Sequence, residues 1–285
     1  MPELPEVQTV VDDLKRDGFE GTVITRARVY WPKTVHGLSP EAFQRGIKGR
    51  RIAAIRRRGK FIVFDFNDAG HLLIHLRMSG RLLVKTPRSP RLKHEHVVLS
   101  FSDHRQLRFH DVRKFGRFYL VTDAAAILGR LGPEPLEDSF CAAGFAAMLK
   151  NCGRMIKPLL LDQAFLAGLG NIYADEALWE ARIHPRKIAA ELGSAEIRAL
   201  YRAIRKVLRR GLRNMGTSLG SGQSNFFSIA GRNGRNRDAL MVFRRTGSAC
   251  PRCRMAIKRI IVGQRSTHIC ERCQRLNAID GSTGV

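Results

Sequence analysis

Two pairs of cysteines late in the chain have the spacing of a metal site. Cys250 and Cys253 form one CxxC pair, and Cys270 and Cys273 form a second pair after sixteen intervening residues. Each pair places two thiolates on one tight turn, and four sulfurs complete the tetrahedral shell that zinc prefers. Because such a shell leaves no position for a water ligand, we expect one structural zinc ion.

The first residues of the chain offer a nucleophile. Met1 precedes Pro2, a small residue that permits removal of Met1, and Pro2 would then present a secondary amine. An α-amino group titrates near pH 7.7–8.0, so a sizeable fraction of it is unprotonated at neutral pH. Such an amine can attack a sugar carbon and form an iminium, while the neighbouring Glu3 acts as acid or base. The alternative is an ordinary proline that opens a helix.

The charge of the chain indicates a polyanionic partner. The 285 residues contain 50 Lys and Arg against 25 Asp and Glu, which gives a formal net charge of +25. A charge this large repels itself in a compact chain unless a polyanion binds, and nucleic acid is a stronger candidate than an anionic membrane surface. The sequence has neither a membrane-spanning apolar run nor a secretory signal near Met1, so we expect a cytoplasmic protein. In this reducing setting, Cys141 and Cys152 are expected to be buried packing residues.

The elements that must position these residues change type near the middle of the chain. The first 17 residues have the apolar spacing of a helix, and short β-type runs follow at 61–64, 72–76, 97–99 and 118–121. Such closely spaced strands predict an antiparallel sandwich or barrel. His94 and His96 are expected to be strand residues, although they flank Glu95 in a weak metal-site pattern.

A proline-rich segment at 131–135 is expected to separate this β region from a helical one. Helices are predicted at 140–149, 157–164, 171–181 and 195–215. The last of these carries seven cations on one face, which is either a solvated surface or a phosphate-binding one. Residues 216–238 form a long loop that is rich in Gly, Ser, Asn and Arg, and loops of this length are mostly functional or disordered.

Seven motifs in the same order resemble those of bacterial formamidopyrimidine-DNA glycosylase, which excises oxidised purines. They are residues 1–7 (MPELPEV), 58–60 (RGK), 75–80 (HLRMSG), 111–116 (DVRKFG), 131–136 (LGPEPL), 168–174 (GLGNIYA) and 264–267 (QRST), the last running into Cys270. Leu4 favours this family over the related endonuclease VIII proteins, which typically carry Gly at that position. The loop diverges from the family through 220–227, so the resemblance implies least about lesion preference.

The resemblance implies a role for each matching residue. Pro2 would be the nucleophile at the lesion sugar, and Glu3 would move protons. The residues expected to bind phosphates are Lys60, His75, Asn171 and Arg265, of which Lys60 is also assigned to catalysis. Met78, Arg113 and Phe115 would fill the gap left by the extruded nucleotide, Lys157 would be a polar member of the lesion pocket, and Glu6 would shape its floor. From the residues alone, Asn171 could equally be a helix N-cap, and Met78 could be a core residue.

The expected fold is α+β. An N-terminal helix and antiparallel β-sandwich (1–133) precede a helix-two-turn-helix domain (134–239, including the loop 216–238), and a four-cysteine zinc hairpin with its tail follows (240–285). The expected activity is that of a bifunctional glycosylase and AP lyase, acting as a monomer on double-stranded DNA that contains oxidised bases. No membrane partner and no diffusible cofactor are expected. The rival from another class is a zinc-ribbon nucleic-acid binder without chemistry, and the closer rival is an oxidised-pyrimidine glycosylase.

Overall fold

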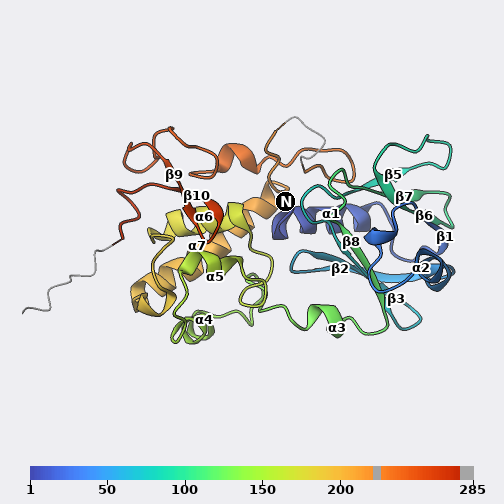
Figure 1. The fold of residues 1–285 in the computed structure, drawn as a ribbon, viewed down its shortest axis with the longest axis horizontal. Helices are drawn as coiled ribbons and strands as arrows, with labels where there is room; N and C mark the ends of the chain where they lie inside the picture. Colours follow the sequence, from blue (N-terminus) through green and yellow to red (C-terminus); the bar gives the residue numbers. More distant parts are fainter. Residues whose placement is uncertain (221–225, 277–285) are drawn as a thin grey trace, which may run out of the picture. The chain divides into compact units, whose positions relative to one another are not determined.

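The computed structural model describes residues 1–220 and 226–276, and its chain divides into two compact units (Figure 1). Unit 1 contains residues 1–131 and 210–238, and unit 2 contains residues 132–209 and the chain from 239 onward. The boundary at 131/132 lies inside the expected proline-rich segment. The loop 216–238, which we expected in the helical domain, belongs instead to unit 1.

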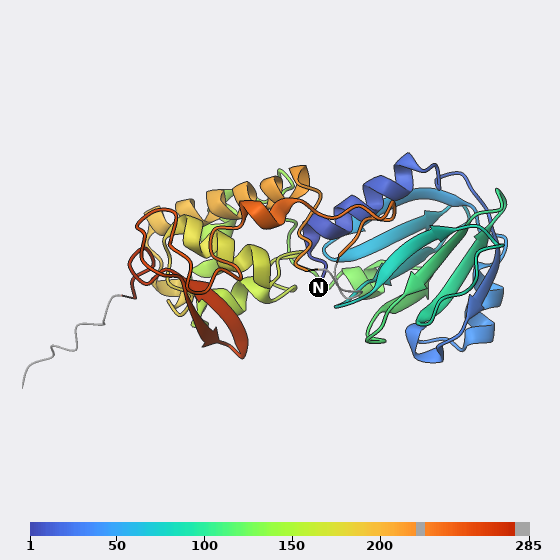
Figure 2. The same ribbon diagram turned by 90° about the horizontal axis from the view of Figure 1, so that it is seen from above.

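Unit 1 is a sandwich of two antiparallel four-stranded sheets, as expected (Figure 2). One sheet has the order β1-β6-β7-β5 and the other the order β2-β3-β4-β8. The strands are β1 (Ile24–Val29), β2 (Ile52–Arg58), β3 (Phe61–Phe66), β4 (His71–His75), β5 (Arg81–Lys85), β6 (Glu95–Phe101), β7 (Gln106–His110) and β8 (Arg117–Val121). Along β6, Val97, Leu99 and Phe101 join the core, because successive strand residues point to opposite faces.

Helix α1 (Leu4–Arg16) packs against β2 and β3, and its apolar stripe completes the sandwich core. Val7, Val10, Val11 and Leu14 are at most 1% exposed, as their i, i+3, i+4, i+7 spacing predicts. Two short helices, α2 (Pro40–Ile47) and α3 (Ala125–Leu128), also belong to this unit.

Unit 2 is helical and ends in a two-stranded hairpin. Its elements are α4 (Ala142–Leu149), α5 (Ile156–Leu161), α6 (Asn171–Ala181), α7 (Ser194–Arg213, whose last turn belongs to unit 1), β9 (Lys258–Val262) and β10 (Arg265–Ile269). Residues Ile172 to Trp179 of α6 are all buried, so α6 is the central helix of the unit. The predicted helices agree with these bounds to within two residues, except that α5 ends three residues earlier than predicted, at Leu161. The carboxylate of the next residue, Asp162, accepts a hydrogen bond from the backbone N–H of Ala164.

The described part of the loop 216–238 completes the sandwich. The backbone N–H of Asn236 donates to the carbonyl of Gly216, which closes the base of the loop. Ile229 is 7% exposed and belongs to the sandwich core, and Phe226 packs against that core. These two apolar anchors explain why the loop belongs to unit 1. The expectations for residues 221–225 lie outside the described residues.

Among the residues described, no helix is long and apolar enough to cross a membrane.

Candidate active site and nucleic-acid interface

The N-terminus of α1 fixes the carboxylate that follows Pro2. Glu3 is the N-cap of α1, and its side chain accepts a hydrogen bond from the backbone N–H of Glu6. In return, the backbone N–H of Glu3 donates to Oε2 of Glu6 at 2.8 Å, which completes a capping box. Glu3 is 2% exposed, and Pro2 is also buried. Pro2 precedes the helix, and the proline in its first turn is Pro5, so Pro2 is not explained as a helix-opening residue.

Glu6 also holds the start of the loop 216–238. Its Oε1 accepts a hydrogen bond from the backbone N–H of Thr217 at 2.7 Å. Gly216 has a φ of +79°, and a Cβ placed there would lie 2.8 Å from Cγ of Glu6. Only glycine therefore combines this backbone conformation with such a close approach. A single buried carboxylate thus ties the helix that carries Glu3 to the base of the loop.

Lys60 and His75 lie at one end of the β2-β3-β4-β8 sheet. Lys60 is in the two-residue turn between β2 and β3, and His75 is the last residue of β4. His75 pairs with Phe61 across the strands, and the two rings meet edge to face with centroids 4.7 Å apart. Lys60 and His75 are 5% and 7% exposed. The structure therefore brings these two predicted phosphate ligands to the same end of the β2-β3-β4 sheet.

His75 is held in its neutral form. Its burial, together with the charges of Arg77 and Lys60, lowers its pKa to about 3. Nδ1 of His75 accepts a hydrogen bond from the backbone N–H of Arg77 at 3.0 Å. The ring proton of the neutral imidazole therefore lies on Nε2, since Nδ1 serves as the acceptor. His75 can donate one hydrogen bond to a phosphate oxygen without carrying a charge.

Asp111 connects the two loops that carry the expected gap-filling residues. It is fully buried, and its Oδ1 accepts a hydrogen bond from the hydroxyl of Ser79. The same oxygen accepts from the backbone N–H of Arg113 at 3.2 Å, and Oδ2 accepts from the backbone N–H of Gly116 at 2.7 Å. The loop after β4 and the loop after β7 are therefore fastened to one carboxylate.

The three expected gap-filling side chains on these two loops point into solvent. Met78 is 41% exposed and Phe115 46% exposed, so Met78 is not a core residue. Arg113 is also exposed, and its guanidinium carbon lies 5.0 Å from the centre of the Phe115 ring. Exposed apolar side chains beside an arginine are the groups that duplex-opening proteins insert between bases.

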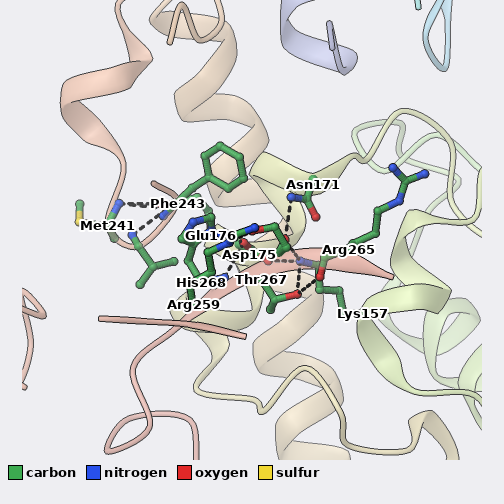
Figure 3. A network of polar contacts seen from close by, with 12 residues as sticks. Lys157, Asn171, Asp175, Glu176, Met241, Phe243, Arg259, Arg265, Thr267 and His268 are labelled. Carbon is green, nitrogen blue, oxygen red and sulfur yellow. Dashed lines mark hydrogen bonds and ion pairs between the residues drawn. The ribbon is translucent and has the colours of Figure 1, made fainter. Parts of the chain in front are cut away.

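In unit 2, a buried network links α5 and α6 to the zinc hairpin (Figure 3). Oδ1 of Asp175, on α6, forms an ion pair with Nζ of Lys157 at 2.6 Å. Its Oδ2 accepts from the backbone N–H of His268 at 2.9 Å and lies 3.0 Å from Nδ1 of the same residue. Lys157 also donates to the carbonyl of Ser266 at 3.0 Å and to the hydroxyl of Thr267 at 2.7 Å.

Lys157 does not have the surroundings of a pocket-lining residue. Its side chain has no exposed surface, and its ammonium is occupied by Asp175 and by β10. In this structure, Lys157 has no surface with which to touch a base. We therefore propose that Lys157 positions β10, in place of the role as a polar member of the lesion pocket that the resemblance implies.

Asn171 contacts the same strand. It is the first residue of α6, whose N-cap is Gly170, so the N-cap interpretation of Asn171 is wrong. Its Nδ2 donates to the carbonyl of Ser266 at 2.9 Å, whereas its buried Oδ1 has no hydrogen-bond partner among the described residues. The amide therefore supports the residue that follows Arg265.

Arg265 begins β10 at the tip of the hairpin. Gly263 and Gln264 form the two-residue turn, and both have positive φ, as in the type I′ turn that suits hairpin twist. A Cβ on Gly263 would lie 2.7 Å from Cγ of Pro158 on α5, so glycine lets the turn approach this helix. Arg265 itself is exposed, on a hairpin tip that α5, α6 and the turn geometry hold in place.

The four cysteines converge as the spacing predicts. Their sulfur atoms all lie within 4.8 Å of one another, with Cys250 and Cys273 at 3.9 Å and Cys253 and Cys270 at 3.3 Å. Zn–S bonds of about 2.3 Å in a tetrahedron require sulfurs about 3.8 Å apart, so the cluster fits zinc. Because all four positions are filled by sulfur, the site is that of one structural zinc ion.

Sequence reasoning missed the acidic residues that hold these elements. Glu176 accepts hydrogen bonds from the backbone N–H groups of Met241, Val242 and Phe243 at 2.9–3.0 Å, which fastens the segment before the zinc knuckle to α6. The signal was available: Asp175 and Glu176 are adjacent acids within a run that is otherwise apolar. A buried carboxylate needs several donors, so such a pair predicts an anchoring point.

Three further expectations are corrected. His94 precedes β6 in a turn with a φ of +71° and is not a strand residue, and the described residues hold no metal cluster that includes it. Cys141 is exposed and caps α4 by accepting from the backbone N–H of Gly144, and Cys152 is half-buried, so neither is a fully buried packing residue. On α7, Arg205 donates to the carbonyls of Pro135 and Glu137 and therefore has a structural role, in contrast to the exposed cations beside it.

Comparisons with known proteins agree with this division. Three family models match the chain: "Formamidopyrimidine-DNA glycosylase N-terminal domain" over residues 1–118, "Formamidopyrimidine-DNA glycosylase H2TH domain" over 131–222, and "Zinc finger found in FPG and IleRS" over 247–276. A formamidopyrimidine-DNA glycosylase of Protochlamydia amoebophila is 46% identical, with 96% of this chain and 100% of the relative covered.

Solved structures give the same result. The complex of the Lactococcus lactis enzyme with DNA containing Fapy-dG has a TM-score of 0.87 at 36% identity. A complex of the protein named MutM with DNA containing carbocyclic 8-oxo-G has a TM-score of 0.88 at 36% identity. Both comparisons cover 96% of this chain and 100% of the other. Fold and site thus define a zinc-finger DNA glycosylase.

The chain belongs to the formamidopyrimidine-DNA glycosylase family.

The neutral state of His75 can be measured directly. The side chain has a pKa near 6.5 in an unfolded chain and about 3 in the folded one. Between these values the unfolded chain binds the proton more readily, so the free energy of unfolding should fall as the pH drops from about 6.5 to about 3. We expect an NMR titration of the imidazole, assigned with His75→Gln, to show no protonation above about pH 4. A midpoint near the ordinary histidine value would contradict this assignment.

Loss of one zinc ligand should release the metal. Cys273→Ser removes one corner of the sulfur tetrahedron, and we expect metal analysis to fall from about one zinc per chain to near zero. Because the hairpin that carries Arg265 is anchored on this knuckle, DNA binding should weaken as well. Cys141→Ser is the matched control, since Cys141 lies outside the cluster, and it should retain zinc. A metal-free Cys273→Ser protein that binds DNA normally would show that the knuckle does not position the hairpin.

Proposed function

We propose that this chain excises oxidised purines from duplex DNA and then cleaves the strand at the exposed sugar. Family membership supports glycosylase activity, and the structural relatives were solved with DNA containing Fapy-dG and 8-oxo-G. The observation that carries the proposal is Glu3, a buried carboxylate fixed by its capping box directly after Pro2. A protein that only binds nucleic acid has no use for this pairing.

The chemistry begins at the Pro2 nitrogen once Met1 is removed. The amine attacks C1′ of the damaged nucleotide, the C1′–N bond to the base breaks, and the base leaves with the bonding electrons. The departing base takes up the proton that the amine loses, protonated Glu3 donates to O4′ as the sugar ring opens, and an iminium joins Pro2 to C1′.

The iminium then draws electrons from the sugar. Loss of the C2′ proton expels the 3′ phosphate in a β-elimination, and loss of the C4′ proton expels the 5′ phosphate in a δ-elimination. Water finally hydrolyses the iminium and restores the free amine of Pro2. Lys60 is proposed to assist from the β2–β3 turn, where it binds the phosphate next to the reacting sugar. Zinc takes no part in these steps and stabilises the hairpin of Arg265.

Attack on C1′ requires the nucleotide to leave the base stack. Extrusion costs a few kcal/mol in lost stacking and pairing, so another group must fill the gap. We propose that Met78 and Phe115 wedge between the bases and that Arg113 hydrogen-bonds the orphaned partner base. His75, Asn171 and Arg265 are proposed to bind phosphates around the extruded nucleotide.

Borohydride trapping tests the nucleophile. Borohydride reduces an iminium to a stable amine, so wild-type protein mixed with an 8-oxoguanine duplex should form a covalent complex. We expect mass spectrometry to locate the DNA on residue 2, because only the terminal amine is unprotonated enough at neutral pH. Lys60→Ala should still give an adduct at residue 2. An adduct on a lysine, or none at all, would contradict the proposed chemistry.

The base opposite the lesion tests the role of Arg113. A guanidinium only donates hydrogen bonds, and cytosine offers acceptors on its pairing edge, whereas adenine offers fewer and adds a donor. Arg113→Ala should reduce excision. It should also narrow the preference for lesions opposite cytosine over lesions opposite adenine by about 1–3 kcal/mol. Lys114→Ala, which removes a neighbouring exposed cation, should leave the preference unchanged. If Arg113→Ala loses the same fraction of excision activity opposite every base, Arg113 is a positioning residue and does not recognise the partner base.

A further inference from the structure

The outer face of the β1-β6-β7-β5 sheet carries a pocket of about 310 Å³. Its lining contains no acidic residue and includes four arginines and a tyrosine that the argument below uses: Arg26, Arg28, Tyr30, Arg91 and Arg108. None of these residues has a role in the chemistry or the DNA contacts described above. All of them belong to unit 1, so the pocket is a feature of the sandwich alone.

The strand register explains why the cations gather there. Arg26 pairs with Ser100 and Arg28 with Val98 across β1 and β6. Residues two apart on a strand share a face. Val97, Leu99 and Phe101 of β6 face the core, so Val98 and Ser100 face the other side of the sheet. Both arginines therefore stand side by side on the solvent face of the sheet.

Arg108 builds the wall of the pocket. It is 3% exposed and donates to the carbonyls of Thr86, Ser89 and Pro90, which fastens the segment between β5 and β6 across the sheet. Its charge is balanced by Glu95, which is fully buried at 3.2 Å. A buried ion pair costs desolvation and is a poor source of stability, so its clear effect here is to fix the shape of the pocket.

The remaining cations of the pocket are not neutralised. Arg26 and Arg28 are exposed and have no carboxylate partner within residues 1–220 and 226–276. Arg91 lies 4.3 Å above the ring of Tyr30, and its Nη1 donates to the backbone carbonyl of Glu95 at 3.3 Å. Besides the paired Arg108, three guanidinium groups without a carboxylate partner among the described residues border the cavity, and one of them, that of Arg91, lies over an aromatic ring.

We propose that this pocket binds a phosphodiester of a DNA strand, outside the contacts made at the lesion. Arginine presents a planar fork of donors that matches phosphate oxygens, and the site offers three such groups with no competing free carboxylate among its lining residues. The net charge of +25 and membership of a DNA glycosylase family favour a nucleic-acid phosphate over a small free anion. The inference rests on the proposed function, because it assumes that the protein works on DNA.

Salt dependence of binding gives the test. We would measure the affinity for long undamaged duplex over a series of salt concentrations, for wild type and for a triple variant with Arg26→Ala, Arg28→Ala and Arg91→Ala. Each neutralised phosphate contributes about 0.9 to the slope of log K against log salt, so loss of this one phosphodiester contact should lower the slope by about 1. The matched control replaces Lys33, Lys48 and Arg130, which are exposed cations elsewhere on unit 1, by alanine.

Tyr30→Ala distinguishes binding by a preformed pocket from attraction by surface charge alone. It removes no charge but frees Arg91, so we expect it to lower affinity several-fold. An equal slope change in the control triple variant, or an unchanged slope in the pocket variant, would overturn the proposal. The proposal would also be overturned if inorganic triphosphate bound at the pocket and duplex DNA did not displace it.

Single-turnover excision at saturating enzyme is measured in parallel. It should be unchanged in the pocket variant, because the chemistry lies elsewhere in unit 1. If wild-type protein itself fails to excise, the proposed function fails. If excision is intact but the salt slope does not change, only the pocket inference fails.

Discussion

A buried carboxylate must be surrounded by hydrogen-bond donors, and this requirement organises the molecule. Glu6, Asp111 and Asp175 are each at most 1% exposed, and each accepts hydrogen bonds or ion pairs from segments distant in sequence. The segments they hold are those that carry the expected DNA contacts: the loop base at 216, the loops of Met78 and Arg113, and the hairpin of Arg265. Hydrogen bonds to charged groups contribute about 1.5–3 kcal/mol each, and leaving such a group unpaired costs more.

The same requirement separates the charges in space. The chain has twice as many basic as acidic residues, yet several of its acids lie in the interior, where they bind backbone N–H groups. Cations such as Arg113, Arg265 and Arg26 are exposed. Acids inside and arginines outside let the fold hold its loops rigidly and still offer a positive surface to a polyanion.

Local patterns were enough to predict much of this arrangement. The helix of Val7 to Leu14, the short strands and the four cysteines each follow from spacing within a few residues. The anchoring role of Asp111 could not be predicted in this way, because its partners lie on two separate loops. Lys157 was predicted to be a pocket residue, and the structure pairs it with Asp175 instead. The loop 216–238 was assigned to the wrong unit because Ile229 reaches the sandwich core through a contact that no local pattern encodes.

Hydrogen exchange in an Asp111→Asn variant tests most directly whether buried carboxylates position the site. An amide side chain cannot accept all the hydrogen bonds that the carboxylate accepts, so the amides of Arg113 and Gly116 should exchange about tenfold faster or more, equivalent to about 1.4 kcal/mol of lost protection. Excision should fall in parallel, while exchange in β2 and β3 stays at the wild-type rate. Asp103→Asn, which affects an ion pair with Arg105 at the surface, is the control. Unchanged exchange at Arg113 and Gly116 would contradict the account.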